Sequence, residues 1–408
     1  MPADRGADRH DGERIRVLHL ITRLVLGGAQ ENTLLTAGGL DRGRYAVTLA
    51  SGPTFGPEGS LEDRILGGIP FERVPDLVRD PHPVKDLVTL ARLYRMIRRG
   101  RYHIVHTHTT KAGLLGRLAA KAAGVPIIVH TPHGHAFHDY LGVRGSEALK
   151  WAERGLARLT DRIICLTPAE RDDHVHLRIG PAGLFEVIHS GVDLERFRHA
   201  RVDPESLRRA LGLRPSGPLV VCVARLVPVK GVEYLLEAVP LVRAAVPAAT
   251  VVFVGDGPLR PLMERRAAAL VRGGAVAFLG LRSDVPEILK LSDVAVLPSL
   301  NEGMGRAAVE ALAAGRPVVA SRVSGIQDIV VDGETGFLVP PADPRALADA
   351  VVRVLVTSGL AQTMGARAAQ SVGAYGIEAM INGIDRLYVR LLSSSGTRAE
   401  SLRKAGLA

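Results

Sequence analysis

The sequence predicts an α/β protein built from two Rossmann-like, doubly wound parallel-sheet domains that face each other across a cleft. The chain has 408 residues, enough for about two domains that each bury a core. Apolar residues make up 47% of it but aromatic residues only 4%, so Val, Leu, Ile and Ala have to fill that core. Such a composition suits parallel strands covered by helices on both faces.

Short apolar runs, typical of buried strands, alternate with helical patterns along the whole chain. In the first half the expected strands are 15–21, 46–50, 104–106, 127–130, 162–166 and 186–189. In the second half they are 219–224, 250–254, 276–279, 294–297, 317–320 and 336–339. Helical patterns lie between them, for example at 28–39, 87–99, 113–123, 232–246 and 306–314.

The domain boundary is expected in the polar, Arg-rich stretch 193–216. We therefore expect a disordered leader (1–14), a first domain (15–195), a second domain (196–376) and a flexible tail (393–408). In open sheets of this kind ligands bind beyond the carboxyl ends of the strands. The loops that follow strands are therefore the place to look for function.

The formal net charge is +10 and the pI is about 10, which suits nucleic acid, an anionic membrane or a phosphorylated substrate. A nucleic-acid binder is disfavoured because basic clusters interleaved with aromatic residues are absent from the sequence. The charged N-terminal segment has no apolar core, and no run approaches the ~20 apolar residues of a membrane span. We therefore expect a cytoplasmic protein.

The loop after strand 219–224 carries two cations, Arg225 and Lys230, just before a helix. A guanidinium, an ammonium and a helix N-terminus together suit a diphosphate, although two solvated surface cations are the plain alternative. A second loop holds Gly255 and Gly257, which let a backbone approach a ligand closely. Arg260 stands where the nicotinamide-dinucleotide fingerprint needs its last glycine, so that interpretation is weak.

The third loop follows strand 294–297 and holds Glu302, with Glu310 eight residues later on the expected helix. Over a helical span these carboxylates would lie about 12 Å apart, whereas a glycosidase pair needs roughly 5–9.5 Å. We interpret them instead as the two ends of an extended ligand site. Glu302 would accept hydrogen bonds from sugar hydroxyls and Glu310 from ribose hydroxyls, with a diphosphate at the N–H groups of Gly303, Met304, Gly305 and Arg306 between them.

The first half offers Gly28 at a helix start and all fourteen histidines of the chain. The histidines gather at His106 and His108 and again at His130, His133, His135 and His138, which leaves a metal site open as an alternative. We expect His133, beside a glycine at a strand end, to face the cleft. The sequence has no Asp-x-Asp, so we predict an enzyme without metal or other cofactor.

These motifs occur together and in order: Gly27-Gly28-Ala29-Gln30, His106-Thr-His108, Arg225…Lys230-Gly231, Gly255-Asp-Gly257-Pro and Glu302-x7-Glu310 followed by Ala314-Gly315-Arg-Pro317. The set resembles the family-4 retaining glycosyltransferases of the glycosyltransferase-B fold, over about residues 15–390. The run that starts at His106 looks most like bacterial capsule and exopolysaccharide members.

The resemblance implies an acceptor-side first domain, completed by a C-terminal helix near 377–392, and a second domain that binds a nucleotide sugar, UDP-linked by family habit. It implies that Arg225 and Lys230 hold the donor diphosphate, Glu302 the sugar and Glu310 the ribose. It places Gly28 at the phosphate or acceptor, His133 at the transferred sugar, and Gly257, Arg282 and residues 303–305 along the nucleotide. Two residues depart from the family pattern, Met304 in place of Phe and Ser190 in place of Asn.

A basic helical pattern holds Arg92, Arg95, Arg98 and Arg99 among apolar residues, and it suits either an anionic membrane bearing a lipid-linked acceptor or plain solvent. Two other functions stay open: a nucleotide-sugar epimerase of the same fold, and a sensor without catalysis, which the intact Glu302, Arg225 and Lys230 disfavour. The acceptor is a carbohydrate or a lipid-linked glycan. Sugar, acceptor, base and oligomeric state are not determined by the sequence.

Overall fold

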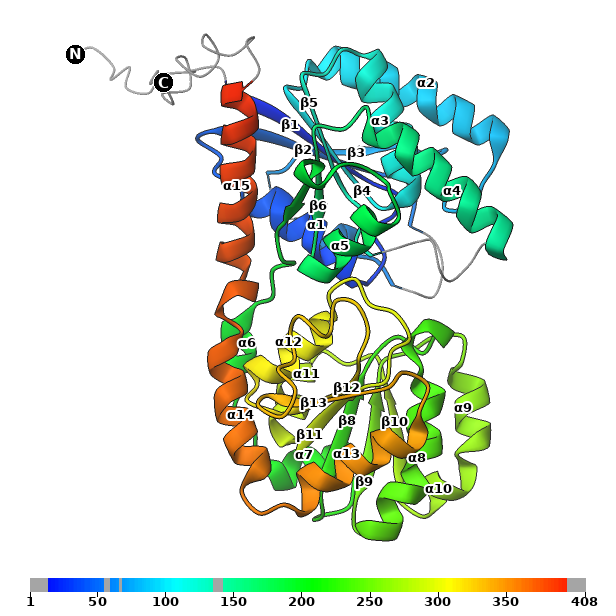
Figure 1. Cartoon of the computed structure of the whole chain (residues 1–408), viewed down its shortest axis with the longest axis vertical. Helices are drawn as coiled ribbons and strands as arrows, with labels where there is room; N and C mark the ends of the chain where they lie inside the picture. Colours follow the sequence, from blue (N-terminus) through cyan, green and yellow to red (C-terminus); the bar gives the residue numbers. More distant parts are fainter. Residues whose placement is uncertain (1–13, 55–58, 66–67, 135–141, 395–408) are drawn as a thin grey trace, which may run out of the picture. The chain divides into compact units, whose positions relative to one another are not determined.

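The computed structural model describes residues 14–54, 59–65, 68–134 and 142–394. Most of the expected leader and tail, and the histidines at positions 135 and 138, lie outside these residues. The chain divides into two compact units (Figure 1). The first holds the chain up to Cys165, His174–Ile188 and the part from Ile381 on; the second holds Leu166–Asp173 and His189–Met380.

The first unit contains a parallel sheet with the order β3-β2-β1-β4-β5-β6-β7. Its strands are β1 (Ile15–Ile21), β2 (Tyr45–Ser51), β3 (Phe71–Arg73), β4 (Ile104–His108), β5 (Ile127–Thr131), β6 (Arg162–Cys165) and β7 (Phe185–Val187). Around it are α1 (Gly28–Gly39), η1 (Glu62–Arg64), α2 (Pro83–Gly100), α3 (Thr110–Ala122), α4 (Gly142–Ala157), α5 (Pro168–His176) and η2 (Ala182–Leu184). The division between units falls within α5 and within α15 (Ile377–Ser394).

Several element bounds in this unit differ from the sequence prediction, and three of the differences have a clear physical reason. The edge strand β3 was not predicted, because its three residues, Phe-Glu-Arg, form no apolar run. Helix α2 begins at Pro83 rather than at residue 87, because proline suits the first helical turn and the His82 ring caps it by accepting from the backbone N–H of Lys85. Strand β4 continues to His108 rather than ending at residue 106, which places this histidine within the sheet.

The two faces of the first sheet are built from different residues. One face carries Leu18, Leu20 and Val105, which pack with α2 and α3 into an apolar core. The opposite face carries His19 and His106 at paired positions of β1 and β4, both buried. Successive residues of a strand point to opposite faces, so the His19 and His106 side chains both lie on this second face.

The C-terminal part of α15 packs within the first unit. Asp385 accepts hydrogen bonds from the Arg44 guanidinium at 2.8 Å and from the Tyr45 hydroxyl at 2.7 Å. A side chain at Gly39 of α1 would clash with Ile381, so that helix and α15 touch closely. The C-terminal part of α15 thereby packs against α1 and the start of β2.

The second unit contains a parallel sheet with the order β10-β9-β8-β11-β12-β13. Its strands are β8 (Leu219–Val223), β9 (Thr250–Val254), β10 (Val276–Gly280), β11 (Val294–Leu297), β12 (Val318–Ser321) and β13 (Gly336–Val339). Its helices are α6 (Leu194–Arg198), α7 (Pro204–Ala210), η3 (Pro228–Lys230), α8 (Val232–Ala245), α9 (Arg260–Arg266), α10 (Ala268–Arg272), α11 (Val285–Leu291), α12 (Arg306–Ala313), α13 (Pro344–Val356), α14 (Leu360–Ser371) and η4 (Gly373–Tyr375).

Both faces of the second sheet are apolar. Val221 and Ala295 face a core with α6, α11 and α12, whereas their neighbours Val220 and Val294 face a core with α8 and α13. This pattern is what continuous apolar strands predict for a sheet covered on both sides. The predicted fold class, two doubly wound parallel-sheet domains, is confirmed. Among the described residues, no helix combines the length and the apolar composition that crossing a bilayer requires.

Candidate functional site

The order of the second sheet reverses between β8 and β11, and the loops after these two strands meet there. From that point the chain winds outward to β9 and β10 on one side and to β12 and β13 on the other. In open parallel sheets such a switch point, at the carboxyl ends of the strands, is where ligands bind. The structure brings two of the predicted residues together at this place, Lys230 after β8 and Glu302 after β11.

Lys230 and Glu302 form a short ion pair. The ammonium lies 2.6 Å from Oε1 of the carboxylate, and the Ser299 hydroxyl donates to the same oxygen at 2.7 Å. Only 22% of the lysine side chain and 10% of the glutamate side chain are exposed. The pair is therefore fixed at the rim of the sheet rather than free to move in solvent.

The backbone holds the two loops against each other. The N–H of Leu300 donates to the carbonyl oxygen of Val229 at 2.8 Å. Gly231 adopts a left-handed conformation (φ 58°), and a Cβ there would come within 2.0 Å of the Pro298 carbonyl oxygen. Glycine is thus required where the two loops cross, and this crossing sets the position of Lys230.

Arg225 and Gly257 lie on the adjoining loops after β8 and β9. Arg225 is exposed, whereas Leu226 beside it is buried and donates its N–H to the carbonyl oxygen of Asp256. A Cβ on Gly257 would come within 2.5 Å of the Leu226 carbonyl oxygen. Glycine at this position therefore permits the loop after β9 to pack closely against the backbone of Leu226.

Helix α12 begins at Arg306, with Gly305 as its N-cap, so Glu302 lies in the loop and Glu310 on the helix. The side chain of Met304 is buried, with only 2% exposed, and packs into the core beside α12. Only the backbone of Met304 can therefore meet a ligand. The backbone N–H groups of the loop from Gly303 on, and of the first turn of α12 that follows it, lie close in sequence to Glu302 and suit an anion.

Arg282 lies after β10 and its guanidinium makes two hydrogen bonds to Asp284, at 2.8 and 2.6 Å. This contact raises the pKa of Arg282 and lowers that of Asp284. The residue thus lies on the same edge of the sheet, in a loop next to that of Gly257, since Gly255 donates its N–H to the Gly280 carbonyl oxygen. Its guanidinium is already engaged by a neighbour.

Cys222 lies on β8, three residues before Arg225, and is buried. Burial raises the pKa of its thiol to about 12. Lys230 lowers this pKa and Glu302 raises it, both by less than burial does. The thiol is therefore neutral at physiological pH and is no nucleophile for this site.

Two predicted residues belong to the first unit. Gly28 is the first residue of α1, just after β1. His133 follows β5 with a left-handed backbone (φ 62°), and its Nε2 lies 3.0 Å from Nδ1 of His108. The sequence did not indicate that His19 also belongs to this group, since a lone histidine in an apolar strand carries no motif.

Comparison with known proteins gives the same interpretation for both halves of the chain. The profile described as Glycosyltransferase Family 4 matches residues 26–196, and that of Glycosyl transferases group 1 matches residues 217–357. The UDP-Gal:alpha-D-GlcNAc-diphosphoundecaprenol alpha-1,3-galactosyltransferase of Escherichia coli is 34% identical over 84% of this chain and 88% of its own length. Putative glycosyltransferase EpsD of Bacillus subtilis is 31% identical over 70% of this chain and 76% of its own.

A solved structure of similar fold is HepE from Anabaena, determined in complex with UDP and glucose. It superposes with a TM-score of 0.79 at 24% identity, covering 92% of this chain and all of the other. The relatives are transferases and give no support to the epimerase alternative. The second unit is doubly wound and has an ion pair at its switch point, and the relatives match most of this chain and most of their own length. These findings agree that the chain belongs to the family-4, group 1 glycosyltransferases and uses a nucleotide-sugar donor.

Proposed function

We propose that the protein transfers a sugar from a UDP-sugar to a carbohydrate or lipid-linked glycan, with retention of anomeric configuration, in capsular or other cell-surface polysaccharide synthesis. The observation that carries the proposal is the Lys230–Glu302 pair at the switch point of the second sheet, beside the start of α12. The Escherichia coli relative, named for UDP-Gal as donor and a diphosphoundecaprenol-linked acceptor, supports both substrate classes.

The donor is held at its two ends and in the middle. Lys230, Arg225 and the N–H groups at the start of α12 take the diphosphate, because all three carry positive charge. Oε1 of Glu302 already accepts from Lys230 and Ser299, so Oε2 is left for a hydroxyl of the sugar. Glu310 takes the ribose, and Gly28 and His133 take the roles that the family resemblance assigns to them.

Transfer breaks the bond between the anomeric carbon and the diphosphate oxygen and forms a bond from that carbon to the acceptor oxygen on the same face. The acceptor proton passes to the departing phosphate oxygen, so no separate base is needed. Negative charge grows on the diphosphate as the bond breaks. Lys230, Arg225 and the helix start stabilise that charge in the transition state more than in the ground state.

The first prediction concerns these cations. Lys230→Ala and Arg225→Ala should each lower kcat about 100-fold or more, because one donor to a developing oxyanion contributes about that much. Radiolabelled transfer from a UDP-sugar to a polyprenyl-diphosphate-linked glycan measures it. Lys121→Ala and Arg272→Ala, both exposed, are matched controls and should transfer at the wild-type rate.

Wild-type turnover in both Lys230→Ala and Arg225→Ala would refute the diphosphate site. The same assay with EDTA tests the proposal that no metal is used. The rate should not change on chelation, and recovery on added Mg²⁺ or Mn²⁺ would contradict that part.

We further propose that the protein is cytoplasmic and rests on an anionic membrane through helix α2. Val84, Leu87 and Val88 are exposed in its first turns, and Arg95 and Arg98 are exposed on the same face two turns later. Apolar side chains followed by arginines along one helix face suit the boundary between acyl chains and anionic headgroups. The membrane would bring a lipid-linked acceptor to the first unit.

The second prediction tests this surface. The wild-type protein should co-sediment with phosphatidylglycerol vesicles and be released as salt screens the arginines. Replacing Arg95, Arg98 and Arg99 by Glu should abolish co-sedimentation and leave transfer to a water-soluble acceptor unchanged. The matched control replaces Arg209, Arg265 and Arg272, exposed arginines of the second unit, by Glu and should still sediment. No enrichment of the wild type on anionic vesicles would end the idea.

A further inference from the structure

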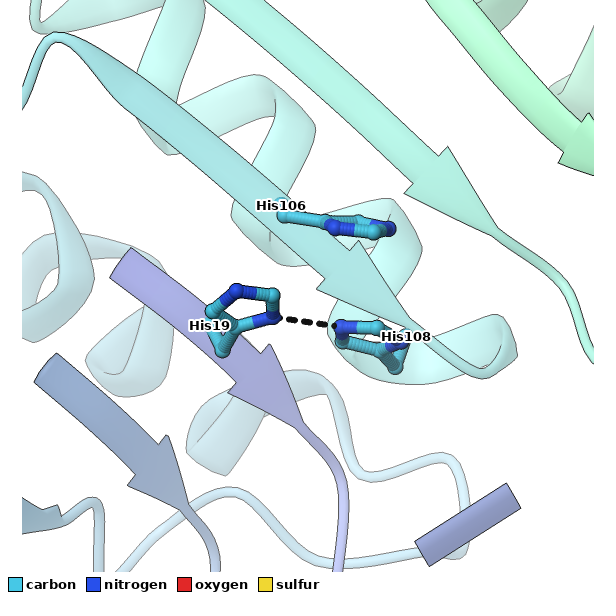
Figure 2. A group of neighbouring side chains, drawn as sticks. All are labelled: His19, His106 and His108. Carbon is cyan, nitrogen blue, oxygen red and sulfur yellow. Dashed lines mark hydrogen bonds between the residues drawn. The ribbon is translucent and has the colours of Figure 1, made fainter. Parts of the chain in front are cut away.

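Three histidines form a buried row inside the first unit. His19 of β1 and His106 of β4 are paired in register, and His108 lies two residues further along β4, so all three side chains point to one face of the sheet (Figure 2). None of the three is more than 1% exposed. Polar groups withdrawn from water in this way are retained only when their hydrogen bonds are satisfied inside the protein.

The row is connected to His133, which follows the carboxyl end of β5. Nδ1 of His19 lies 3.0 Å from Nε2 of His108, and Nδ1 of His108 lies 3.0 Å from Nε2 of His133. The rings of His108 and His133 stack with their centroids 5.3 Å apart. Each contact uses one nitrogen of each ring, so His19, His108 and His133 form a continuous chain of hydrogen bonds.

At its other end, this series of hydrogen bonds reaches side chains of α15 and β5. The Tyr388 hydroxyl lies 2.7 Å from Nδ1 of His106 and 3.5 Å from Nε2 of His19, which makes the latter the longest contact of the group. Nε2 of His106 lies 2.7 Å from the Thr131 hydroxyl. Both nitrogens of every buried ring in the row therefore have a partner.

Neutral rings make such a chain directional. Burial lowers the pKa of His19 to about 3, and burial with the neighbouring rings lowers the pKa of His106 and His108 well below the ordinary value. A neutral imidazole has one N–H and one lone pair, so each ring donates on one side and accepts on the other. The tautomer of one ring then dictates the tautomer of the next, as far as His133.

We propose that His19 and His108, with Tyr388 as their anchor, are positioning residues that hold His133 in a single tautomer and ring orientation for its contact with the donor sugar. This inference rests on the proposed function only for the role of His133. The left-handed backbone of that residue supports it, since a non-glycine residue takes this conformation at a cost and such costs gather at functional sites.

A metal centre is the rival explanation, because one nitrogen from each of His19, His106 and His108 lies within 4.8 Å of the others. Two nitrogens bound to a tetrahedral zinc at 2.0–2.1 Å are about 3.3 Å apart. The 3.0 Å between His19 and His108 is shorter and is an ordinary hydrogen-bond distance. The observed contacts thus favour the chain.

Substitutions of His19 separate its two contacts. In His19→Asn the amide lies near the former Nδ1 and keeps the contact with His108, whereas in His19→Gln it lies near the former Nε2 and keeps only the contact with Tyr388. We expect kcat within about threefold of the wild type for the Asn variant. For the Gln and Phe variants we expect a kcat about 10- to 100-fold lower with the UDP affinity unchanged, as for a misplaced reacting group.

The ¹⁵N shifts of His133 provide a second readout that needs no activity. The wild type and His19→Asn should show one neutral tautomer, and His19→Phe a mixture of two. A mixture in the wild type, or equal kcat in all variants, overturns the proposal, as does stoichiometric zinc that purifies with the wild type and is lost in His19→Phe. If the wild type transfers no sugar, the proposed function fails, while the tautomer measurement still decides whether the chain positions His133.

Discussion

At the scale of single residues, the two departures from the family pattern are in contact with each other. The backbone N–H of Ser190 donates to Sδ of Met304 at 3.1 Å, and Arg306 donates to the Ser190 hydroxyl at 3.0 Å and to the Gly191 carbonyl oxygen at 2.6 Å. Neither departure removes a charge from the site. Together they form one packing arrangement that ties the loop of Glu302 to the segment of Ser190 and Gly191.

The third prediction follows from the burial of Met304. Met304→Leu should lower the free energy of unfolding by less than about 1.5 kcal/mol, because the volume is conserved. Met304→Ala should lower it by about 2–5 kcal/mol through the cavity it leaves. Urea unfolding with and without UDP measures both effects. Weakened UDP binding in the Leu variant, despite normal stability, would show that the side chain contacts the ligand.

At the scale of elements, helices α3 and α4 are held together by a buried ion pair. Arg117 of α3 is fully buried, and one of its Nη atoms lies 2.7 and 2.8 Å from the two carboxylate oxygens of Glu153 on α4. Its Nε also donates to the Gly113 carbonyl oxygen. Burial lowers the pKa of Arg117, and the carboxylate opposes that shift by stabilising the charge.

The fourth prediction concerns this pair. Glu153→Ala should lower the free energy of unfolding of the first unit by about 3–5 kcal/mol, because it leaves a buried guanidinium without its carboxylate. The double variant Arg117→Met, Glu153→Leu should recover most of that loss, since the charges are removed together. Circular dichroism in urea measures the losses. A single variant as stable as the wild type would mean that water reaches the guanidinium.

At the scale of the whole molecule, the two units share the order of their first six strands, the first unit adds a seventh, and their interiors differ. The second sheet is apolar on both faces, whereas the first carries the histidine row on one face. Apolar side chains are indifferent to pH, but buried neutral histidines are not. The two units should therefore respond differently to acid.

The fifth prediction is that acid destabilises the first unit selectively. The folded unit keeps His19 neutral down to a pKa of about 3, and His106 and His108 neutral well below pH 6.5, whereas the unfolded chain protonates all three near 6.5. The unfolded state then binds more protons, so stability is fully present above about pH 7 and falls as the pH drops below 6.5. Each histidine contributes about 1.4 kcal/mol per pH unit.

Fluorescence of Trp151, the single tryptophan and part of the first unit, follows this unfolding in urea between pH 8 and 5. His19→Phe should reduce the slope with pH by one proton. A pH-independent urea midpoint in the wild type would show that the folded protein protonates these rings as readily as the unfolded chain does.

Local sequence patterns are enough to predict most of the helices and strands and the loops that carry chemistry. Strand–helix alternation, two-sided apolar runs and the start of α12 at Arg306 follow from local periodicity, which acts within a few residues. The same alternation of strands and helices predicts that the loops after strand ends hold Arg225, Lys230 and Glu302. The three-residue edge strand β3 escaped prediction because its pairing, not its composition, makes it a strand.

Which of these residues meet depends on the folding of each unit and cannot be predicted from local patterns. Lys230 and Glu302 are 72 residues apart and touch because β8 and β11 are neighbours in the sheet. Gly257 packs on Leu226, and His19 joins His108, through the register of adjacent strands. Pairing between distant strands depends on the packing of the whole unit, since the hydrogen bonds of a sheet join residues that no local pattern links.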